Sequence, residues 1–361
     1  MDIKEKINLI KEVGEEVIGL EEIEAKLKVG QELIAYDGFE PSGKIHIAQG
    51  LLRAINIQKL LQAGIKFKLL VADWHAYANN KIGGDMAKIE KTGQYFIEVW
   101  KACGLDVSKV EIIRSSDLVK DSEYWLLVLK IAKASTVNRM VRCSQIMGRN
   151  EAETLSAAQI IYPCMQAADI FRLNVDIAQL GMDQRKVNML ARQIADELGL
   201  KKPAAVHHHM LISLQPPVDK INSTDSKEDQ TVALKMSKSK PDSAIFMTDT
   251  KDEIYAKIKK AYCPPNDILI NPVLEYFKYI IFAKYPQVEI KREAKFGGDL
   301  IFDSYNKLES AYQKGDIYPL DLKDNLSRYL DELISPVRDY FVNNPNAKKL
   351  KDEVESFVVT R

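Results

Sequence analysis

The stretch YDGFEPSGKIHIAQG, residues 36–50, places polar side chains at a predicted strand-to-helix junction. An apolar run that predicts a strand ends near Pro41, and a helical pattern follows from His46. Such a junction points backbone N–H groups and the positive end of a helix dipole outward, which suits a phosphate. Lys44, His46 and Gln49 lie there, and His46 and Gln49 are expected to share one face of the first helical turn. A solvated surface turn could carry the same residues.

A second basic group lies in LKMSKSKPDSAIFMTDT, residues 234–250. Lys235, Ser237 and Lys238 follow a polar, proline-bearing segment, 216–231, that predicts a surface loop. A loop with ammonium and hydroxyl groups could close over a triphosphate and stabilise charge during displacement at phosphorus. The alternative is an ordinary solvated basic loop.

A third group is a polar stripe in YPCMQAADIF, residues 162–171. Tyr162, Gln166 and Asp169 recur at spacings of four and three, which places them on one side of a helix. The positions between them are apolar, so the helix is expected to be buried. Buried Asp and Gln side chains need partners, which either a polar pocket or ordinary core hydrogen bonds could supply.

A fourth group, LGMDQRK at residues 180–186, directly follows a predicted strand. Asp183 and Gln184 would therefore lie at the carboxyl end of that strand, and Gly181 would let a ligand approach the backbone closely.

These groups require elements that bring them together. Apolar runs predict strands at 32–37, 66–72, 109–114, 174–180 and 204–213, with helices at 46–63, 85–104 and 184–199 between them. This alternation predicts an α/β fold with a Rossmann-like, doubly wound parallel sheet, which binds ligands beyond the carboxyl ends of its strands. We expect a helical segment at 1–30, a catalytic domain at 31–248 with a helical insertion at about 115–160, and an all-α domain at 249–361.

Composition narrows the class of protein. The 361 residues carry 51 Lys+Arg and 51 Asp+Glu, so attraction to nucleic acid would have to come from local patches. No apolar run could span a bilayer, and four scattered cysteines without a CxxC pair predict reduced thiols in the cytoplasm. His207, His208 and His209 are adjacent, so along a strand they point to opposite faces and cannot converge on one ion. We expect no bound metal.

Two motifs together resemble a known family. PSGKIHIAQG resembles the HIGH motif of class I aminoacyl-tRNA synthetases, and KMSKS, residues 235–239, matches the second signature of that class. YDGFEPSGKIH, ADWHAY, IYPCMQAADI, GMDQRK, KIKKAYCP and KFGGDL are similar to the tyrosyl-tRNA synthetases of archaeal and eukaryotic type, over residues of about 30 to 340. The resemblance implies a tyrosine–tRNA ligase with ATP and Mg²⁺, tyrosine and tRNA(Tyr) as its partners, and a helical anticodon-binding domain. It also implies a homodimer formed through the 115–160 insertion.

The resemblance further implies residue roles. Tyr36 and Asp169 would bind the substrate phenol, and Tyr162, Gln166 and Gln184 its α-amino group. His46, Gln49, Lys235 and Lys238 would be catalytic. ATP or the adenylate would contact Gly38, Lys44, His46, Gly181, Asp183, Lys235, Ser237 and Lys238. Arg142, Arg185 and Lys186 would read the first base pair of the acceptor stem, and Asp321 the first anticodon base.

The sequence departs from the family pattern at two positions. Gln49 stands where many class I enzymes have the final histidine of the motif, and it can donate a hydrogen bond but carries no charge. Ile280 stands where some relatives have the aromatic residue that stacks on an anticodon base, with Phe282 nearby.

Three other functions remain open at this point. A tryptophanyl-tRNA synthetase would share the fold, but polar Tyr36, Asp169 and Gln166 suit a phenol better than an indole, which only donates. A synthetase-like protein without catalysis would fit the altered first motif but not the intact lysine segment. A nucleotidyltransferase that builds a small cofactor would explain His46 and the lysines, but not the helical C-terminal domain.

Overall fold

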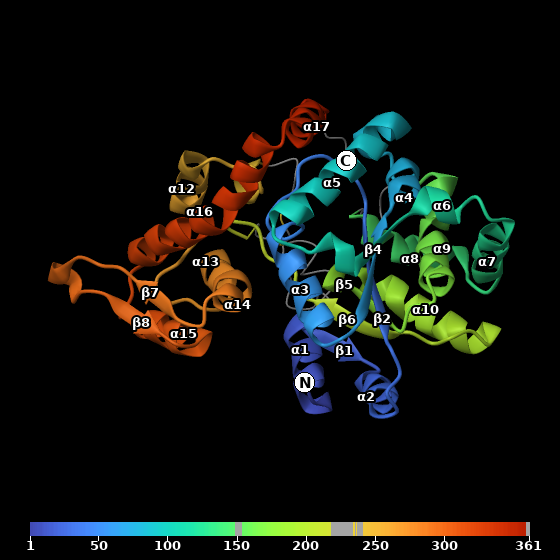
Figure 1. Ribbon diagram of the computed structural model, residues 1–361, viewed down its shortest axis with the longest axis horizontal. Coiled ribbons are helices and arrows are strands. Elements are labelled where there is room, and N and C mark those ends of the chain that lie inside the picture. The colour runs from blue at the N-terminus through green and yellow to red at the C-terminus, as the bar shows by residue number, and fades with distance from the viewer. Residues whose placement is uncertain (149–153, 218–233, 235, 237–240, 359–361) are drawn as a thin grey trace.

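A six-stranded sheet in the order β1-β6-β5-β2-β3-β4 forms the centre of the protein (Figure 1). The computed structural model describes residues 1–148, 154–217, 234, 236 and 241–358. The strands are β1 (Glu16–Ile18), β2 (Ile34–Phe39), β3 (Lys66–Val71), β4 (Val110–Arg114), β5 (Ile177–Gly181) and β6 (Ala204–His208). All neighbouring pairs are parallel except β1 and β6. Every residue of β5 and β6 is buried, as expected for inner strands of a sheet covered on both faces.

The two faces of the sheet carry separate apolar cores. One core joins α1 (Ile3–Val13), α3 (Leu51–Gln62) and α5 (Met86–Ala102) to the C-terminal helices. The other joins α7 (Ser122–Lys133), α9 (Ala157–Arg172) and α10 (Arg185–Leu198). Ala35 of β2 belongs to the first core and Tyr36 to the second, because successive side chains of a strand point to opposite faces.

The amino-terminal segment is not purely helical. Gly14 follows α1, and the N–H of Glu15 then donates to the carbonyl of His207 at 2.8 Å. This contact starts β1, which pairs antiparallel with β6 before α2 (Leu20–Lys28) begins. The strand has three residues, too few for an alternating pattern to appear in the sequence.

The prediction that His46 and Gln49 lie in the first turn of a helix was wrong. The helix α3 begins at Leu51, and before it His46 forms a β-bridge and residues 47–50 form a turn. The N–H of Ile47 donates to the carbonyl of Ile245 at 2.8 Å, and the N–H of Met247 donates to the carbonyl of Ile45 at 2.9 Å. Pairing with a segment so distant in the chain overrides the local helical pattern.

Helices account for most of the remaining chain. The insertion contains α6 (Ser115–Leu118), α7, α8 (Val137–Cys143) and η3 (Ser144–Met147). The C-terminal part comprises α12 (Lys251–Lys260), α13 (Pro272–Tyr276), the π-helical turn η6 (Phe277–Ile281), α14 (Phe282–Lys284), α15 (Tyr305–Lys314), α16 (Pro319–Asn343) and α17 (Pro345–Glu355). It also contains a short hairpin of β7 (Val288–Ile290) and β8 (Leu300–Phe302), so it is helical apart from these two strands. None of the described helices combines the length and apolar character needed to cross a membrane.

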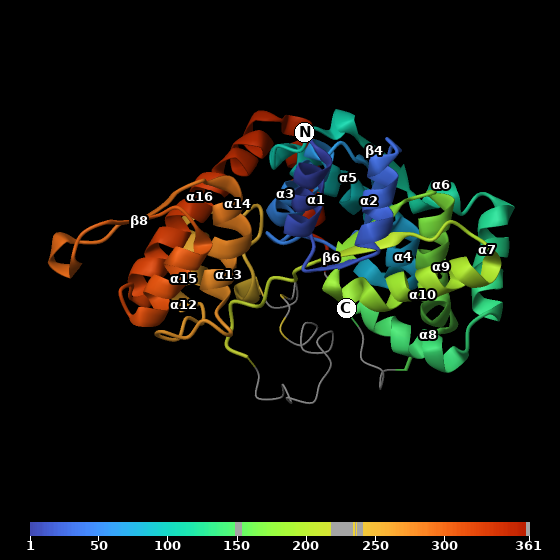
Figure 2. The ribbon, with the colours of Figure 1, turned by 90° about the horizontal axis from the view of Figure 1, so that it is seen from below.

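The C-terminal helices lie beside the sheet, as two views at right angles show (Figures 1 and 2). His209 joins the two parts of the chain, because its Nδ1 lies 3.0 Å from Glu15 and its Nε2 lies 3.1 Å from Glu275 of α13. Its ring stacks on Tyr279 of η6, with centroids 4.2 Å apart. Burial lowers the pKa of His209, but the two carboxylates outweigh it and raise the pKa to about 9.

We expect His209→Gln to remove part of the pH dependence of stability. A histidine whose pKa is raised on folding stabilises the fold fully below its unfolded pKa, and this contribution is lost as pH rises through about 9. Urea denaturation at pH 6.5 and at pH 9.5 gives the free energy of unfolding at each pH. The decrease from pH 6.5 to pH 9.5 should therefore be larger in the wild type than in the variant. Equal falls in the two proteins would show that the contact between Glu15, His209 and Glu275 does not couple to folding.

Candidate active site

The first motif segment lies against residues 245–247, which follow the second motif in the chain. His46 forms a β-bridge with Phe246, so the PSGKIHIAQG segment runs against the chain that follows KMSKS. Gly50 is needed for this approach, since a Cβ there would lie 2.4 Å from Cγ of Met247. The carbonyl of Leu234 accepts a hydrogen bond from the N–H of Ser213 at 2.7 Å, and the buried Met236 contacts the Tyr276 hydroxyl. Lys235, Ser237 and Lys238 lie outside the described residues.

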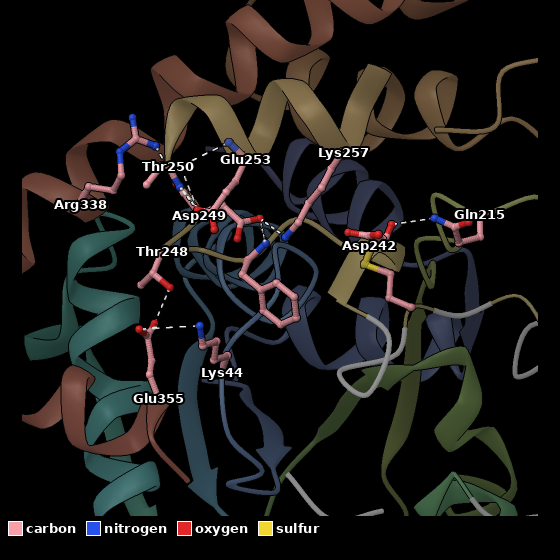
Figure 3. Close-up of polar contacts among 12 residues, drawn as sticks. Lys44, Gln215, Asp242, Thr248, Asp249, Thr250, Glu253, Lys257, Arg338 and Glu355 are labelled. Atoms are coloured by element: carbon pink, nitrogen blue, oxygen red, sulfur yellow. Dashed lines mark hydrogen bonds and ion pairs between the residues drawn. The ribbon is translucent and has the colours of Figure 1, made fainter. Parts of the chain in front are cut away.

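Polar contacts fix the segment that follows KMSKS to the C-terminal helices (Figure 3). Asp249 binds Lys257 of α12 at 2.6 Å, and its carbonyl accepts from Arg338 of α16 at 3.0 Å. Thr248 donates to Glu355 of α17 at 2.7 Å, and Lys44 lies 3.7 Å from the same carboxylate. Lys44 thus faces α17 here, and its predicted contact with the nucleotide stays a prediction.

Tyr36 and Asp169, which the family resemblance paired, lie on facing elements. Tyr36 points from β2 toward α9, and Asp169, 1% exposed, lies on the facing side of that helix. The Asp169 carboxylate accepts from the Tyr124 hydroxyl at 3.0 Å and lies 3.1 Å from Nε2 of His75. The Tyr36 hydroxyl is buried and has no hydrogen-bond partner among the described residues. Burial, followed by the charge of Asp169, raises the pKa of Tyr36 well above its usual value, so the phenol stays neutral.

The rest of the stripe continues along α9. The Tyr162 hydroxyl donates to Glu40 at 2.5 Å, and the ring of His75 lies edge-on to Tyr162 with centroids 5.0 Å apart. Gln166 donates to the side-chain oxygen of Gln184 at 3.1 Å. Gln184 lies in the turn η4 (Met182–Gln184) that follows β5, at the carboxyl end of the strand as predicted. A polar wall therefore runs from Tyr36 to Gln184 beside the carboxyl ends of β2 and β5.

The sequence did not single out four members of this wall: Glu40, His75, Asn79 and Tyr124. Asn79 donates to Glu40 at 3.1 Å and is completely buried. Burial tends to lower the pKa of His75, but the Asp169 carboxylate outweighs it and leaves that pKa raised. His75 lies in ADWHAY and Glu40 in YDGFEPSGKIH, so the family stretches were the only signal for either residue. Nothing in the local pattern around Tyr124 distinguishes it from a core tyrosine.

The residues predicted to read tRNA lie on three different helices. Arg185 and Lys186 begin α10, where Arg185 binds Glu16 at 2.8 Å and Lys186 contacts the side chain of Gln145. Arg142 lies in the last turn of α8. Asp321 lies in the first turn of α16, three residues after Tyr318, which is 61% exposed. Ile280 is fully buried in η6, so it cannot stack on a base in this structure.

The histidine triplet is held by protein groups. His207 lies 2.8 Å from Glu16, and His208 lies 3.0 Å from Arg53. Within the described ranges, no three His, Cys, Asp or Glu side chains gather in a way that could hold a metal ion.

Comparison with known proteins agrees with this geometry. A family model described as "tRNA synthetases class I (W and Y)" matches residues 28–335. The chain is 45% identical over 363 residues to "Tyrosine--tRNA ligase 1, cytoplasmic" of Arabidopsis thaliana, which covers 100% of this chain and 90% of that protein. It is 43% identical over 360 residues to "Tyrosine--tRNA ligase" of Sulfurisphaera tokodaii, which covers 99% of this chain and 98% of that protein.

A solved structure is also similar over the whole chain. It is that of tyrosyl-tRNA synthetase complexed with L-tyrosine from Pyrococcus horikoshii, with a TM-score of 0.89 and 38% identity over 98% of this chain and 100% of that chain. The matching family model and the similarity over the whole chain show that the chain belongs to the class I tyrosyl-tRNA synthetases.

Proposed function

We propose that this chain activates L-tyrosine with ATP and then transfers the tyrosyl group to the 3′ end of tRNA(Tyr). The observation that carries the proposal is the buried pair of Tyr36 and Asp169, which face each other across β2 and α9. A phenol placed between them can donate to the Asp169 carboxylate and accept from the Tyr36 hydroxyl. An indole N–H could only donate and would leave Tyr36 without a partner.

In the first step, the carboxylate of tyrosine attacks the α-phosphorus of ATP, the bond to the β-phosphate oxygen breaks, and pyrophosphate leaves. A carboxylate is already a nucleophile near neutral pH, so the protein must position the groups and neutralise phosphate charge. His46, Gln49, Lys235 and Lys238 supply donors and positive charge for this task. Mg²⁺ enters with the phosphates of ATP, a mode common for this ion.

The remaining residues hold the substrate in place. Tyr162, Gln166 and Gln184 bind the α-amino group, with Glu40 fixing the Tyr162 hydroxyl at 2.5 Å. The adenylate lies at the carboxyl ends of the strands, along Gly38, Gly181 and Asp183, with Lys44 and Ser237 on the phosphate side.

In the second step, a ribose hydroxyl of the terminal adenosine attacks the tyrosyl carbonyl and AMP leaves. Arg142, Arg185 and Lys186 contact the first base pair of the acceptor stem, and Asp321 contacts the first anticodon base. The exposed ring of Tyr318, next to Asp321, is available for stacking on that base. The cytoplasm is the proposed location, as in the name of the Arabidopsis relative.

The test is amino-acid-dependent exchange of pyrophosphate into ATP, with tyrosine, with tryptophan and without an amino acid. Exchange with tyrosine alone is the expected result. Exchange with tryptophan would favour the related synthetase, exchange without an amino acid would favour a nucleotidyltransferase, and no exchange would favour a non-catalytic protein.

The insertion provides the surface for a homodimer. Leu126 and Leu129 of α7 are 43% and 64% exposed, and Val137 of α8 is 64% exposed. Apolar side chains grouped on neighbouring elements are typical of an interface with another protein. Two copies of this face would bury them against each other, and one tRNA would span both subunits.

We expect Leu129→Glu to convert the dimer into monomers, because it places a charge on this apolar face. Sedimentation velocity at several concentrations measures the change. Lys109→Glu, at an exposed lysine outside the insertion, is the matched control and should remain dimeric. A wild-type protein that sediments as a monomer at every concentration would exclude this interface.

A further inference from the structure

A buried polar cluster lies behind the nucleotide half of the site. Asp37 of β2, Gln179 of β5 and His208 of β6 are 0%, 0% and 3% exposed. Their neighbours Ala35, Ile177 and Val206, two positions earlier in each strand, belong to the core that contains α3. The three polar residues therefore face α3, away from the tyrosine wall, and none has a role in the chemistry above.

Arg53 of α3 is the cation of this cluster. Its side chain is 11% exposed, and Nη1 forms an ion pair with Oδ2 of Asp37. The same nitrogen lies 3.0 Å from Nδ1 of His208, and Nε2 of Gln179 lies 2.7 Å from that atom. Arg53 and Gln179 are both donors there, so Nδ1 of His208 accepts and the imidazole carries its proton on Nε2. Burial, then the charge of Arg53, holds the pKa of His208 well below its usual value, which leaves it neutral.

The cluster touches the backbone that is proposed to bind the adenylate. Oδ1 of Asp37 accepts the N–H of Gly38 at 2.9 Å, so one carboxylate holds Gly38 with one oxygen and Arg53 with the other. On the next strand, a Cβ at Gly181 would lie 2.6 Å from Oδ1 of Asp183 and 3.4 Å from Nε2 of His208. The imidazole that Arg53 contacts and the carboxylate of Asp183 thus lie against the same glycine.

The charges in this region are two carboxylates and one guanidinium. Burial, with a smaller contribution from the charge of Asp183, raises the pKa of Asp37 to about 7 even though Arg53 and the N–H of Gly38 oppose it. Burial lowers the pKa of Arg53, while Asp37 and Asp183 both raise it. If Arg53 were removed, the carboxylates of Asp37 and Asp183 would repel each other and would have lost the guanidinium as their buried counter-ion. One of them would then take up a proton or move.

We propose that Arg53 is a positioning residue for the ribose of ATP. Arg53 holds the backbone of Gly38 through Asp37. It holds the turn from Gly181 to Asp183 through His208 and through the attraction between its guanidinium and Asp183. Both contacts fix the groups that recognise the ribose hydroxyls. This inference rests on the proposed function, because it assigns Gly38 and Asp183 to the adenylate.

The first experiment measures pyrophosphate exchange by Arg53→Met and Arg53→Lys with ATP, 2′-deoxyATP and 3′-deoxyATP. In Arg53→Met the KM for ATP should rise about 10- to 100-fold, by analogy with the loss seen when a group that orients a metal ligand is removed. The KM for tyrosine should not change, because Tyr36 and Asp169 lie on the other face of the sheet. The increase in KM caused by Arg53→Met should be smaller for the deoxynucleotide that lacks the contacted hydroxyl, because that nucleotide has already lost the contact. Arg53→Lys should recover part of the loss, since it keeps the charge but not the planar fork.

Two further variants separate positioning from stability. Arg192→Met removes an arginine with a similar 13% exposure that binds Glu22, and it should leave all KM values unchanged. Asp37→Leu combined with Arg53→Met replaces the buried pair by apolar groups, which is often neutral for stability. This double variant should unfold near the wild-type temperature yet keep the raised KM for ATP.

The outcomes separate this inference from the proposed function. A wild-type protein without tyrosine-dependent exchange overturns the proposed function. Tyrosine-dependent exchange in the wild type, with Arg53→Met raising the KM for ATP and for both deoxynucleotides equally, overturns the inference alone. Restored ATP binding in the double variant would also overturn it, because Arg53 would then serve only to neutralise Asp37.

Discussion

Asp169→Asn is expected to weaken the discrimination between tyrosine and phenylalanine by about 100-fold. Asp169 is buried, already accepts a hydrogen bond from Tyr124 and lies 3.1 Å from Nε2 of His75, so its orientation is fixed before substrate binds. Phenylalanine would leave the Tyr36 hydroxyl without a partner and would take away the substrate contact of Asp169, which gives a rejection of about 10⁴–10⁵-fold, a magnitude taken from this enzyme class itself. Removing the charge from one side of the contact should lower the tyrosine preference by about 100-fold, the worth of a hydrogen bond to a charged group.

Pyrophosphate exchange with the two amino acids measures this preference as the ratio of their kcat/KM values. The matched control is Asp176→Asn, since Asp176 is also buried next to β5 but binds Lys26 and Lys201 at 2.8 Å and 3.0 Å at the opposite end of that strand. It should lower stability and leave the preference unchanged. If Asp169→Asn still rejects phenylalanine as strongly as the wild type, the phenol does not bind between Tyr36 and Asp169.

Lys235→Ala and Lys238→Ala are expected to slow adenylate formation while tyrosine binds as before. Both lysines belong to KMSKS, whose described neighbours Leu234 and Met236 are anchored to Ser213 and Tyr276. Donors aimed at charge that develops in the transition state are each worth about 3 kcal/mol, or about 100-fold in rate. Tyrosine is proposed to bind at Tyr36 and Asp169, which neither substitution changes, so its affinity should stay the same.

Single-turnover formation of the adenylate gives the rate, and equilibrium dialysis gives the affinity for tyrosine. Lys251→Ala removes the same charge from the exposed start of α12, and it should leave both quantities unchanged. A loss of tyrosine affinity as large as the loss of rate would contradict the role assigned to Lys235 and Lys238.

Local sequence patterns were sufficient to place site residues that lie on a single helix or at the end of a single strand. The spacing of Tyr162, Gln166 and Asp169 placed them on one side of a buried helix, and α9 has that form. The position of Asp183 and Gln184 after an apolar run placed them at the carboxyl end of a strand, where η4 follows β5. Both patterns repeat within one or two turns of the chain, so neighbouring residues carry the whole signal.

Other features depended on partners far away in the chain. The helix α3 begins at Leu51, later than predicted, because residues 45–47 pair with residues 245–247. The strand β1 forms because the carbonyl of His207 accepts a hydrogen bond from the N–H of Glu15. The residues around the predicted substrate phenol, His75 and Tyr124, come from segments with no pattern that points to Asp169.

By itself, the sequence determined the alternation of strands and helices, the family and most of the residues proposed to bind tyrosine. Only the tertiary structure decided which neighbours serve which half of the site: Tyr36 faces α9 and Asp169, whereas the adjacent Asp37 faces α3 and Arg53. The physical reason is that side-chain alternation along a strand is local, while the element that covers each face is set by packing between distant segments.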